Sequence, residues 1–193
     1  MYRRRCLLGM VLFLAAASSL RAYDDSRLSR EAAEKMDRVL NDLLKKKHEG
    51  KPLPAVVVFS QKELNSYLYY KAGTQLPPNL KNIDISLLPG SVVAQADLDL
   101  SQPGGSSKVP EMLQRPVSIY LTGKLTTKKG WGYFQPQTFR IAFLPIPVTV
   151  LDSIVQYLTE HQSGKAHSLN DWFALPYGIK EVTIQKERLI IVP

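Results

Sequence analysis

The stretch "FLPIPVTVLDSIVQYL", residues 143–158, joins two apolar segments with almost no polar linker between them. Phe143 is expected to end a long strand, because Pro145 and Pro147 cannot donate hydrogen bonds to a strand ladder. Pro147 also suits the first turn of a helix. This helix is expected to bury Leu151, Ile154, Val155 and Leu158. Because the connection is so short, the helix should fold back onto the apolar face of the sheet that precedes it.

Two predicted β-hairpins lie before this junction, and both show the alternation of apolar and polar residues typical of half-buried strands. The first spans residues 82–100 and turns at Pro89-Gly90. The second spans residues 116–147 and turns at Lys128-Lys129-Gly130, and Pro136 within it predicts a bulge or an edge position. A third hairpin is expected in residues 175–193. Strands joined by such short turns predict an antiparallel sheet.

Two further helices are expected ahead of the hairpins. Residues 26–47 carry apolar side chains at helical spacing and end in a basic run, which is followed by glycine and proline. After a short apolar strand in residues 54–59, Ser60 and Glu63 are spaced as the capping box of a second helix. The order of the elements predicts an α+β fold with an antiparallel β-sheet of hairpins, amphipathic helices and an additional N-terminal helix.

Residues 1–22 have the three regions of a secretory signal peptide: a basic start, an apolar centre and a small-residue cleavage site. The apolar centre is shorter than the roughly 20 residues that span a bilayer, which favours cleavage over an uncleaved membrane anchor. Cleavage would remove four arginines, lower the formal charge from +8 to +4 and leave a single domain, residues 23–193, without cysteine. A periplasmic or secreted protein is therefore expected, and nucleic acid is not expected as a partner.

Three stretches together resemble a known family. They are "FSQKELNSYL" in residues 59–68, "GKLTTKKGWGYFQPQTFRIAFLPIPVTVLDSIV" in residues 123–155 and "LPYGIKEVTIQKERLIIV" in residues 175–192. They are similar to small exported, lipid-binding-like envelope proteins near the TULIP (SMP-like) fold, which include the YpmS-like family of unknown function. The resemblance implies a curved antiparallel sheet wrapped on one or two amphipathic helices, with an apolar groove between them. It implies no catalytic residue.

The resemblance and the apolar faces of the hairpins together predict a groove for a lipid or another apolar ligand, such as an acyl chain. Its expected lining consists of Leu64, Leu68, Ile119, Leu121, Phe143, Leu151, Ile154 and Leu158. The alternative is an envelope scaffold or interaction protein with a filled core and no ligand, since a sequence does not show whether side chains fill the space. Trp131 and Trp172 each lie beside a turn or loop, where a membrane surface or an envelope protein could contact them.

The sequence contains no motif typical of catalysis, metal binding or phosphate binding. There is no G-x-S-x-G elbow, and "PGGSSK" in residues 103–108 lacks the ending of a phosphate loop. His161 and His167 are not spaced as zinc ligands, and Asp97 and Asp99 lack the glycine-bearing loop of a calcium site. A non-enzymatic protein without a metal or a cofactor is expected. A hydrolase with an unrecognised site is the remaining alternative.

Overall fold

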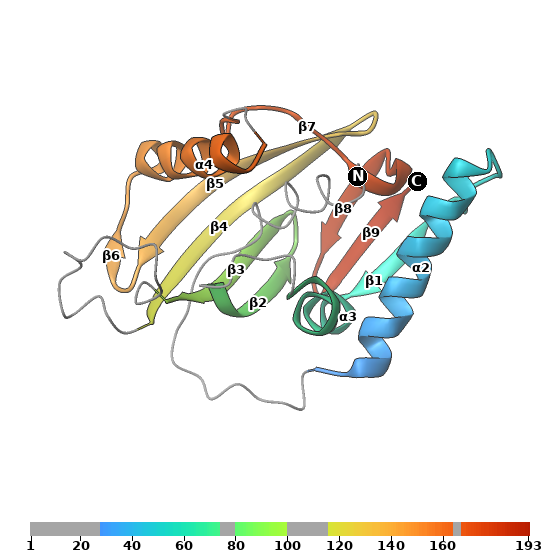
Figure 1. Cartoon of the computed structure of the whole chain (residues 1–193), viewed down its shortest axis with the longest axis horizontal. Coiled ribbons are helices and arrows are strands. Elements are labelled where there is room, and N and C mark those ends of the chain that lie inside the picture. Colours follow the sequence, from blue (N-terminus) through green and yellow to red (C-terminus); the bar gives the residue numbers. More distant parts are fainter. Residues whose placement is uncertain (1–27, 74–79, 100–115, 164–166) are drawn as a thin grey trace.

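The computed structural model describes residues 28–73, 80–99, 116–163 and 167–193 (Figure 1). The expected signal peptide, residues 1–22, lies outside them. In the described residues, helices pack against antiparallel strands around one contiguous apolar core. This confirms the predicted α+β class with an N-terminal helix. One sheet was expected from the sequence, but the strands form two.

Residues at both ends of helix α2 (Arg30–His48) stabilise it. The Ser29 side chain accepts a hydrogen bond from the Ala32 N–H, which caps the first turn. The last turn is basic, as the negative end of the helix dipole favours. One stripe of the helix faces the core through Ala33, Met36, Leu40 and Leu43. The helix therefore contributes its apolar side to the interior and its charged side to solvent.

Strand β1 (Val57–Ser60) runs directly into α3 (Gln61–Tyr67), which continues as the π-helical turn η3 (Leu68–Ala72). The predicted capping box is present: the Ser60 side chain accepts from the Glu63 N–H, and the Glu63 carboxylate accepts from the Ser60 N–H. Asn65 ties α3 to the next strand, because its side chain both donates to Ile85 O and accepts from Ile85 N–H.

The larger sheet has the strand order β2-β3-β4-β5-β6, with β7 pairing β5. Its strands are β2 (Leu80–Leu88), β3 (Ser91–Leu98), β4 (Val117–Lys128), β5 (Trp131–Ile141), β6 (Leu144–Pro145) and β7 (Phe173–Ala174). Both predicted hairpins are confirmed, with their turns where the sequence places them. The register of β4 and β5 shifts between Thr122 and Gly123, opposite Pro136, so the bulge that this proline predicts is also present.

The smaller sheet has the order β1-β9-β8, with β8 (Glu181–Gln185) and β9 (Arg188–Val192) forming the predicted last hairpin. Strand β9 also pairs with β1, in a register that places Val57 opposite Ile191. The short turn η6 (Pro176–Gly178) precedes β8 and lies against α2. Two distant parts of the chain thus share one sheet, and α2 lies beside it (Figure 1).

Helix α4 (Val148–Ser163) begins directly after Pro147 and folds back onto β5, with Leu151 and Val155 buried (Figure 1). The prediction that Phe143 ends the long strand is wrong: β5 ends at Ile141, and Phe143 lies in the turn before β6. The left-handed φ of 53° at Ala142 reverses the chain there. The Phe143 side chain consequently points out of the sheet and is 84% exposed.

Candidate functional site

A largely enclosed apolar cavity of about 80 Å³ lies where the N-terminal helices meet the two sheets. Helix α2 contributes Met36 and Leu40, which are four residues apart and therefore share a face. The remaining lining comes from α3, η3, both sheets and the segment of β7 and η6: Phe59, Leu64, Tyr67, Leu68, Leu87, Val92, Leu125, Phe134, Phe173, Leu175, Tyr177, Ile179, Val182, Ile184, Leu189 and Ile191. The cavity thus lies within the core, and segments from most of the chain form its wall.

Two glycines let aromatic rings of the cavity wall lie close to the strands. A Cβ added at Gly123 would be 2.3 Å from Phe134 Cζ, and one added at Gly132 would be 2.7 Å from Phe173 Cζ. Both distances are too short for real atoms, so a side chain at either glycine would displace the ring beside it. Since Phe134 and Phe173 line the cavity, these glycines help to set its shape.

Two tyrosines, Tyr67 and Tyr177, line the cavity with the apolar parts of their side chains. Burial raises the pKa of Tyr67, and a hydrogen bond from Tyr177 acts in the opposite direction. Tyr177 has a left-handed φ of 57° and is followed by Gly178 with a φ of 79°. Such a conformation is costly for a tyrosine, and it places the half-buried Tyr177 side chain in the cavity wall. The hydroxyl of Tyr67 is thereby satisfied within the protein and the rings of both tyrosines face the apolar interior.

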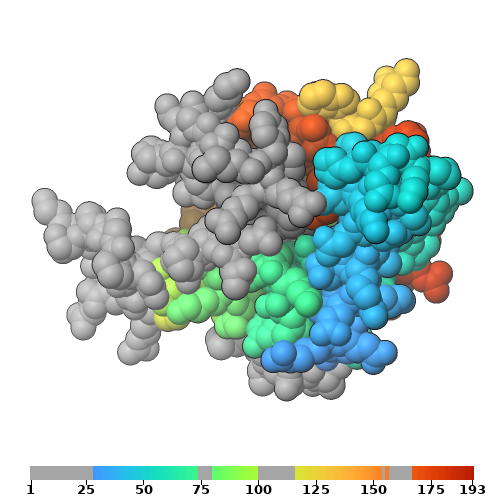
Figure 2. Space-filling view, turned by 45° about the vertical axis from the view of Figure 1, so that its right-hand side comes forward, coloured from blue at the N-terminus to red at the C-terminus, as the bar shows by residue number. Residues whose placement is uncertain are grey.

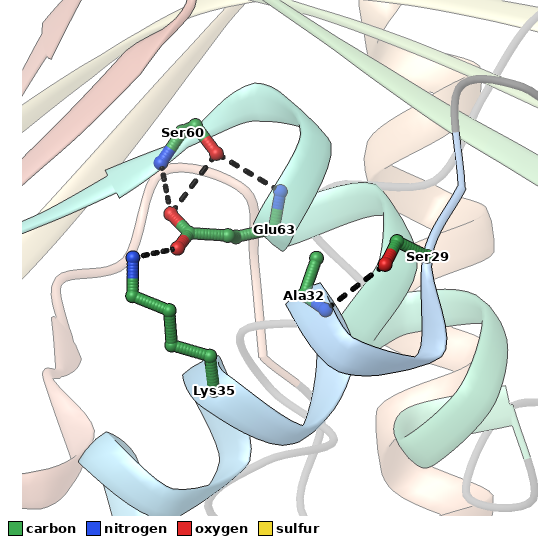
Figure 3. A network of polar contacts seen from close by, with 5 residues as sticks. All are labelled: Ser29, Ala32, Lys35, Ser60 and Glu63. Carbon is green, nitrogen blue, oxygen red and sulfur yellow. Dashed lines mark hydrogen bonds and ion pairs between the residues drawn. The ribbon is translucent and has the colours of Figure 1, made fainter.

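A polar network fixes the start of α3 next to the cavity (Figure 3). The Glu63 carboxylate accepts from Ser60 N–H at 2.7 Å and from Ser60 Oγ at 2.9 Å, and it lies 2.5 Å from Lys35 Nζ of α2. Burial alone would raise the pKa of Glu63, but the hydrogen bonds from Lys35 and Ser60 and the charge of Lys35 outweigh it and hold that pKa below its ordinary value. The network joins α2 to α3, the two helices that cover the cavity.

The residues predicted to line a groove separate into four groups. Leu64 and Leu68 line the cavity. Ile119, Leu121 and Leu151 are buried in the core but do not line it. Phe143 is exposed at the end of β5 and does not belong to the cavity wall. Ile154 and Leu158 belong to α4, but their side chains are not among those that the structure describes.

The sequence analysis missed the contributions of α2, η6 and the smaller sheet to the cavity. The stripe of Met36 and Leu40 was visible as helical periodicity, but periodicity does not identify the surface that a helix covers. For Tyr177, the following glycine was the available signal, because Tyr-Gly is compatible with a tight left-handed turn. Neither signal shows that these side chains meet the hairpins around one space.

No group of three or more histidine, cysteine, aspartate or glutamate residues that could hold a metal ion occurs in the described ranges. Among the helices in those ranges, none combines the length and the apolar character needed to cross a bilayer. Comparisons with models of known protein families and with curated protein sequences found no match.

Proposed function

We propose that this chain is an exported, non-enzymatic protein that binds an apolar ligand, such as the end of an acyl chain, in the cavity between α2, α3 and the two sheets. The observation that carries the proposal is an apolar space of about 80 Å³ inside an otherwise continuous core. From the sequence, the groove was expected between the sheet and α4. The proposal now places the ligand between α2, α3 and the two sheets, where the cavity lies.

An empty apolar cavity has an energetic cost. At about 24 cal/mol per Å³, a space of about 80 Å³ costs about 2 kcal/mol of stability. A ligand that fills it restores the lost packing and adds about 0.8 kcal/mol for each methylene group removed from water. The cavity therefore favours occupation by an apolar group.

The volume limits the kind of ligand. Pockets for drug-sized molecules span roughly 300–1,000 Å³, so a whole lipid does not fit in the space as it stands. A few methylene groups at the end of a chain match it better. The unbranched side chain of Met36 in the wall can change its rotamer more easily than branched neighbours, so a longer segment could be admitted by local movement of α2.

A second function, that of an envelope interaction protein without a ligand, is supported by a different feature. Residues 142–150 contain no charged side chain, and most of them are exposed. The large exposed apolar side chains of this segment are Phe143, Leu144, Val148 and Val150. A continuous apolar surface of this kind is typical of contact sites for other proteins.

Native mass spectrometry of the purified mature protein, together with displacement of a fluorescent fatty acid, tests the first proposal. We expect Met36→Lys to abolish probe binding, because a charge in the apolar cavity is poorly solvated. Val39→Lys, on the same helix but outside the cavity wall, is the matched control and should bind the probe as the wild type does. If circular dichroism shows that Met36→Lys does not fold, Met36→Phe tests the same position, because its ring should occupy cavity volume and weaken probe binding.

Two results would overturn the proposal. One is a wild-type protein that carries no added mass and binds no probe, which would leave a filled core and favour the interaction protein. The other is equal loss of binding in Met36→Lys and Val39→Lys, which would place the bound probe somewhere other than the cavity.

A further inference from the structure

Three segments meet at one end of the molecule. In the turn between β4 and β5, Gly130 N–H donates to Lys180 O at 2.9 Å, and Gly130 O accepts from Leu175 N–H at 2.8 Å. Gly178 of η6 lies against the aliphatic chain of Lys47, since a Cβ added there would be 3.0 Å from Lys47 Cδ. Figure 2 shows the result: the yellow β4–β5 turn projects next to the cyan C-terminal half of α2. The segments are therefore neighbours in space.

This end of the molecule is basic. We call it the basic end and define it by four exposed lysines, Lys45, Lys47, Lys128 and Lys129. Lys180 lies nearby, but its Nζ donates to Pro193 O at 3.0 Å. Lys46 and Lys51 lie nearby but are paired with Asp42 and Glu49. Of the four that define it, none forms an ion pair with another described residue. Besides Asp42 and Glu49, two exposed carboxylates lie near this end: Asp171, which accepts from Ser168 N–H and precedes Trp172, and Glu181, which follows Lys180. Lysines thus outnumber carboxylates at this end.

Two tryptophans, the only ones in the chain, lie at the basic end. Trp131 begins β5 directly after the β4–β5 turn and is 51% exposed. Trp172 precedes β7, is 47% exposed and has its ring 5.6 Å from that of Tyr133. Because Trp131 pairs with Ala174 and Gly132 with Phe173, Trp172 lies beside the start of β5. Indole rings exposed among lysines match the chemistry of a membrane interface, which is apolar beneath and anionic at its surface.

The same segment also forms part of the cavity wall. Trp172 is exposed, whereas the next residue, Phe173, lines the cavity together with Leu175 and Tyr177. One short segment therefore has its outer side at the basic end and its inner side at the cavity. A surface that contacts lipid here would lie next to the space in which we place the ligand.

We propose that the basic end docks on an anionic phospholipid surface, with Trp131 and Trp172 at the level of the headgroups. This inference deepens the proposed function, on which it rests, by naming the source of the acyl chain. The lysines supply charge complementary to anionic headgroups, and the indole rings supply the apolar contact. An acidic protein would match the lysines alone, so the pair of exposed tryptophans favours the lipid surface.

Intrinsic fluorescence reads the contact directly, because both tryptophans lie in the proposed surface. The full mature chain is titrated with vesicles of phosphatidylglycerol mixed with phosphatidylcholine, and separately with phosphatidylcholine alone. We expect a blue shift, and quenching by brominated acyl chains, with the anionic vesicles only. Co-sedimentation should weaken as salt is raised, since the attraction between exposed charges is screened.

Charge-reversal variants locate the contact. The double variant Lys128→Glu, Lys129→Glu should lower vesicle affinity by at least about tenfold. Lys186→Glu makes the same kind of change in the β8–β9 turn, which contacts β2 at Leu87 instead, and should have little effect. Phe143→Ser, beyond the far end of β5, tests whether the most exposed aromatic ring outside the basic end is the true anchor. Trp131→Ser with Trp172→Ser should lose co-sedimentation while circular dichroism stays unchanged.

Several outcomes overturn the inference: equal binding to both kinds of vesicle, no effect of the double lysine variant, loss of binding in Phe143→Ser, or capture of an acidic protein without any response to vesicles. Displacement of the fatty-acid probe in solution separates this failure from that of the proposed function. A protein that binds the probe but ignores vesicles refutes the docking surface alone. A protein that binds vesicles but no probe refutes the cavity ligand alone.

Discussion

Adding one methylene group to the cavity wall should stabilise the protein. Val92 of β3 is buried and lines the cavity, and isoleucine keeps its β-branched shape. Since the cavity of about 80 Å³ has room for the new group, Val92→Ile should gain about 0.8 kcal/mol by burying it. In a filled core the same change would instead cost about 1–3 kcal/mol through overpacking. The sign of the effect therefore reports whether the space exists.

Val117→Ile is the matched control. Val117 begins β4 and is also buried, but it belongs neither to the contiguous core nor to the cavity wall. We expect this variant to be no more stable than the wild type, or less stable. Urea midpoints at an unchanged m-value measure both variants. Val92→Ile should also weaken binding of the fatty-acid probe roughly fourfold, because the cavity then buries one methylene group of the ligand fewer. Destabilisation of both variants to a similar degree would refute the cavity.

Three further predictions concern the capped helix, the core and the N-terminus. Glu63→Gln should be less stable than the wild type at neutral pH. Because folding lowers the pKa of Glu63, the difference in stability should be present above the ordinary pKa of 4.5 and should shrink as the pH falls through the lowered pKa. A difference in urea midpoints that stays constant down to about pH 2 would contradict this. Leu151→Ala should cost about 2–5 kcal/mol, because this buried side chain holds α4 on the sheet; an unshifted urea midpoint would mean that α4 is not packed there. N-terminal sequencing of exported protein should begin at or near Tyr23, and an intact Met1 on a membrane-integrated species would exclude cleavage.

Features that depend on neighbouring residues could be predicted from the sequence. The capping box of Ser60 and Glu63, the turn at Lys128-Lys129-Gly130 and the bulge opposite Pro136 are all confirmed. In each, the residue types act on their own backbone or on a strand joined by a tight turn. The predicted burial of Leu151 is confirmed for the same reason, because Pro147 leaves α4 almost no freedom to leave the sheet.

Features that depend on distant segments could not be predicted in this way. The pairing of β1 with β9 joins Val57 to Ile191, and no local pattern specifies such a partner. Phe143 was misplaced because alanine, unlike glycine, gives no signal of the left-handed turn at Ala142. The cavity was misplaced for a related reason: Leu64 and Leu68 were identified from their shared helix face, but the space they face is completed by α2 and η6.

The empty space in the core also affects how the protein responds to hydrostatic pressure. Compression favours the state of smaller volume, and unfolding lets water occupy a void that the folded chain leaves empty. A space of about 80 Å³ per molecule corresponds to about 50 mL/mol, which is comparable to the whole volume change of unfolding for many proteins. The unliganded protein should therefore unfold at lower pressure than a form with the cavity occupied. A pressure-unfolding curve would then report the fraction of molecules with an occupied cavity, without any chemical label.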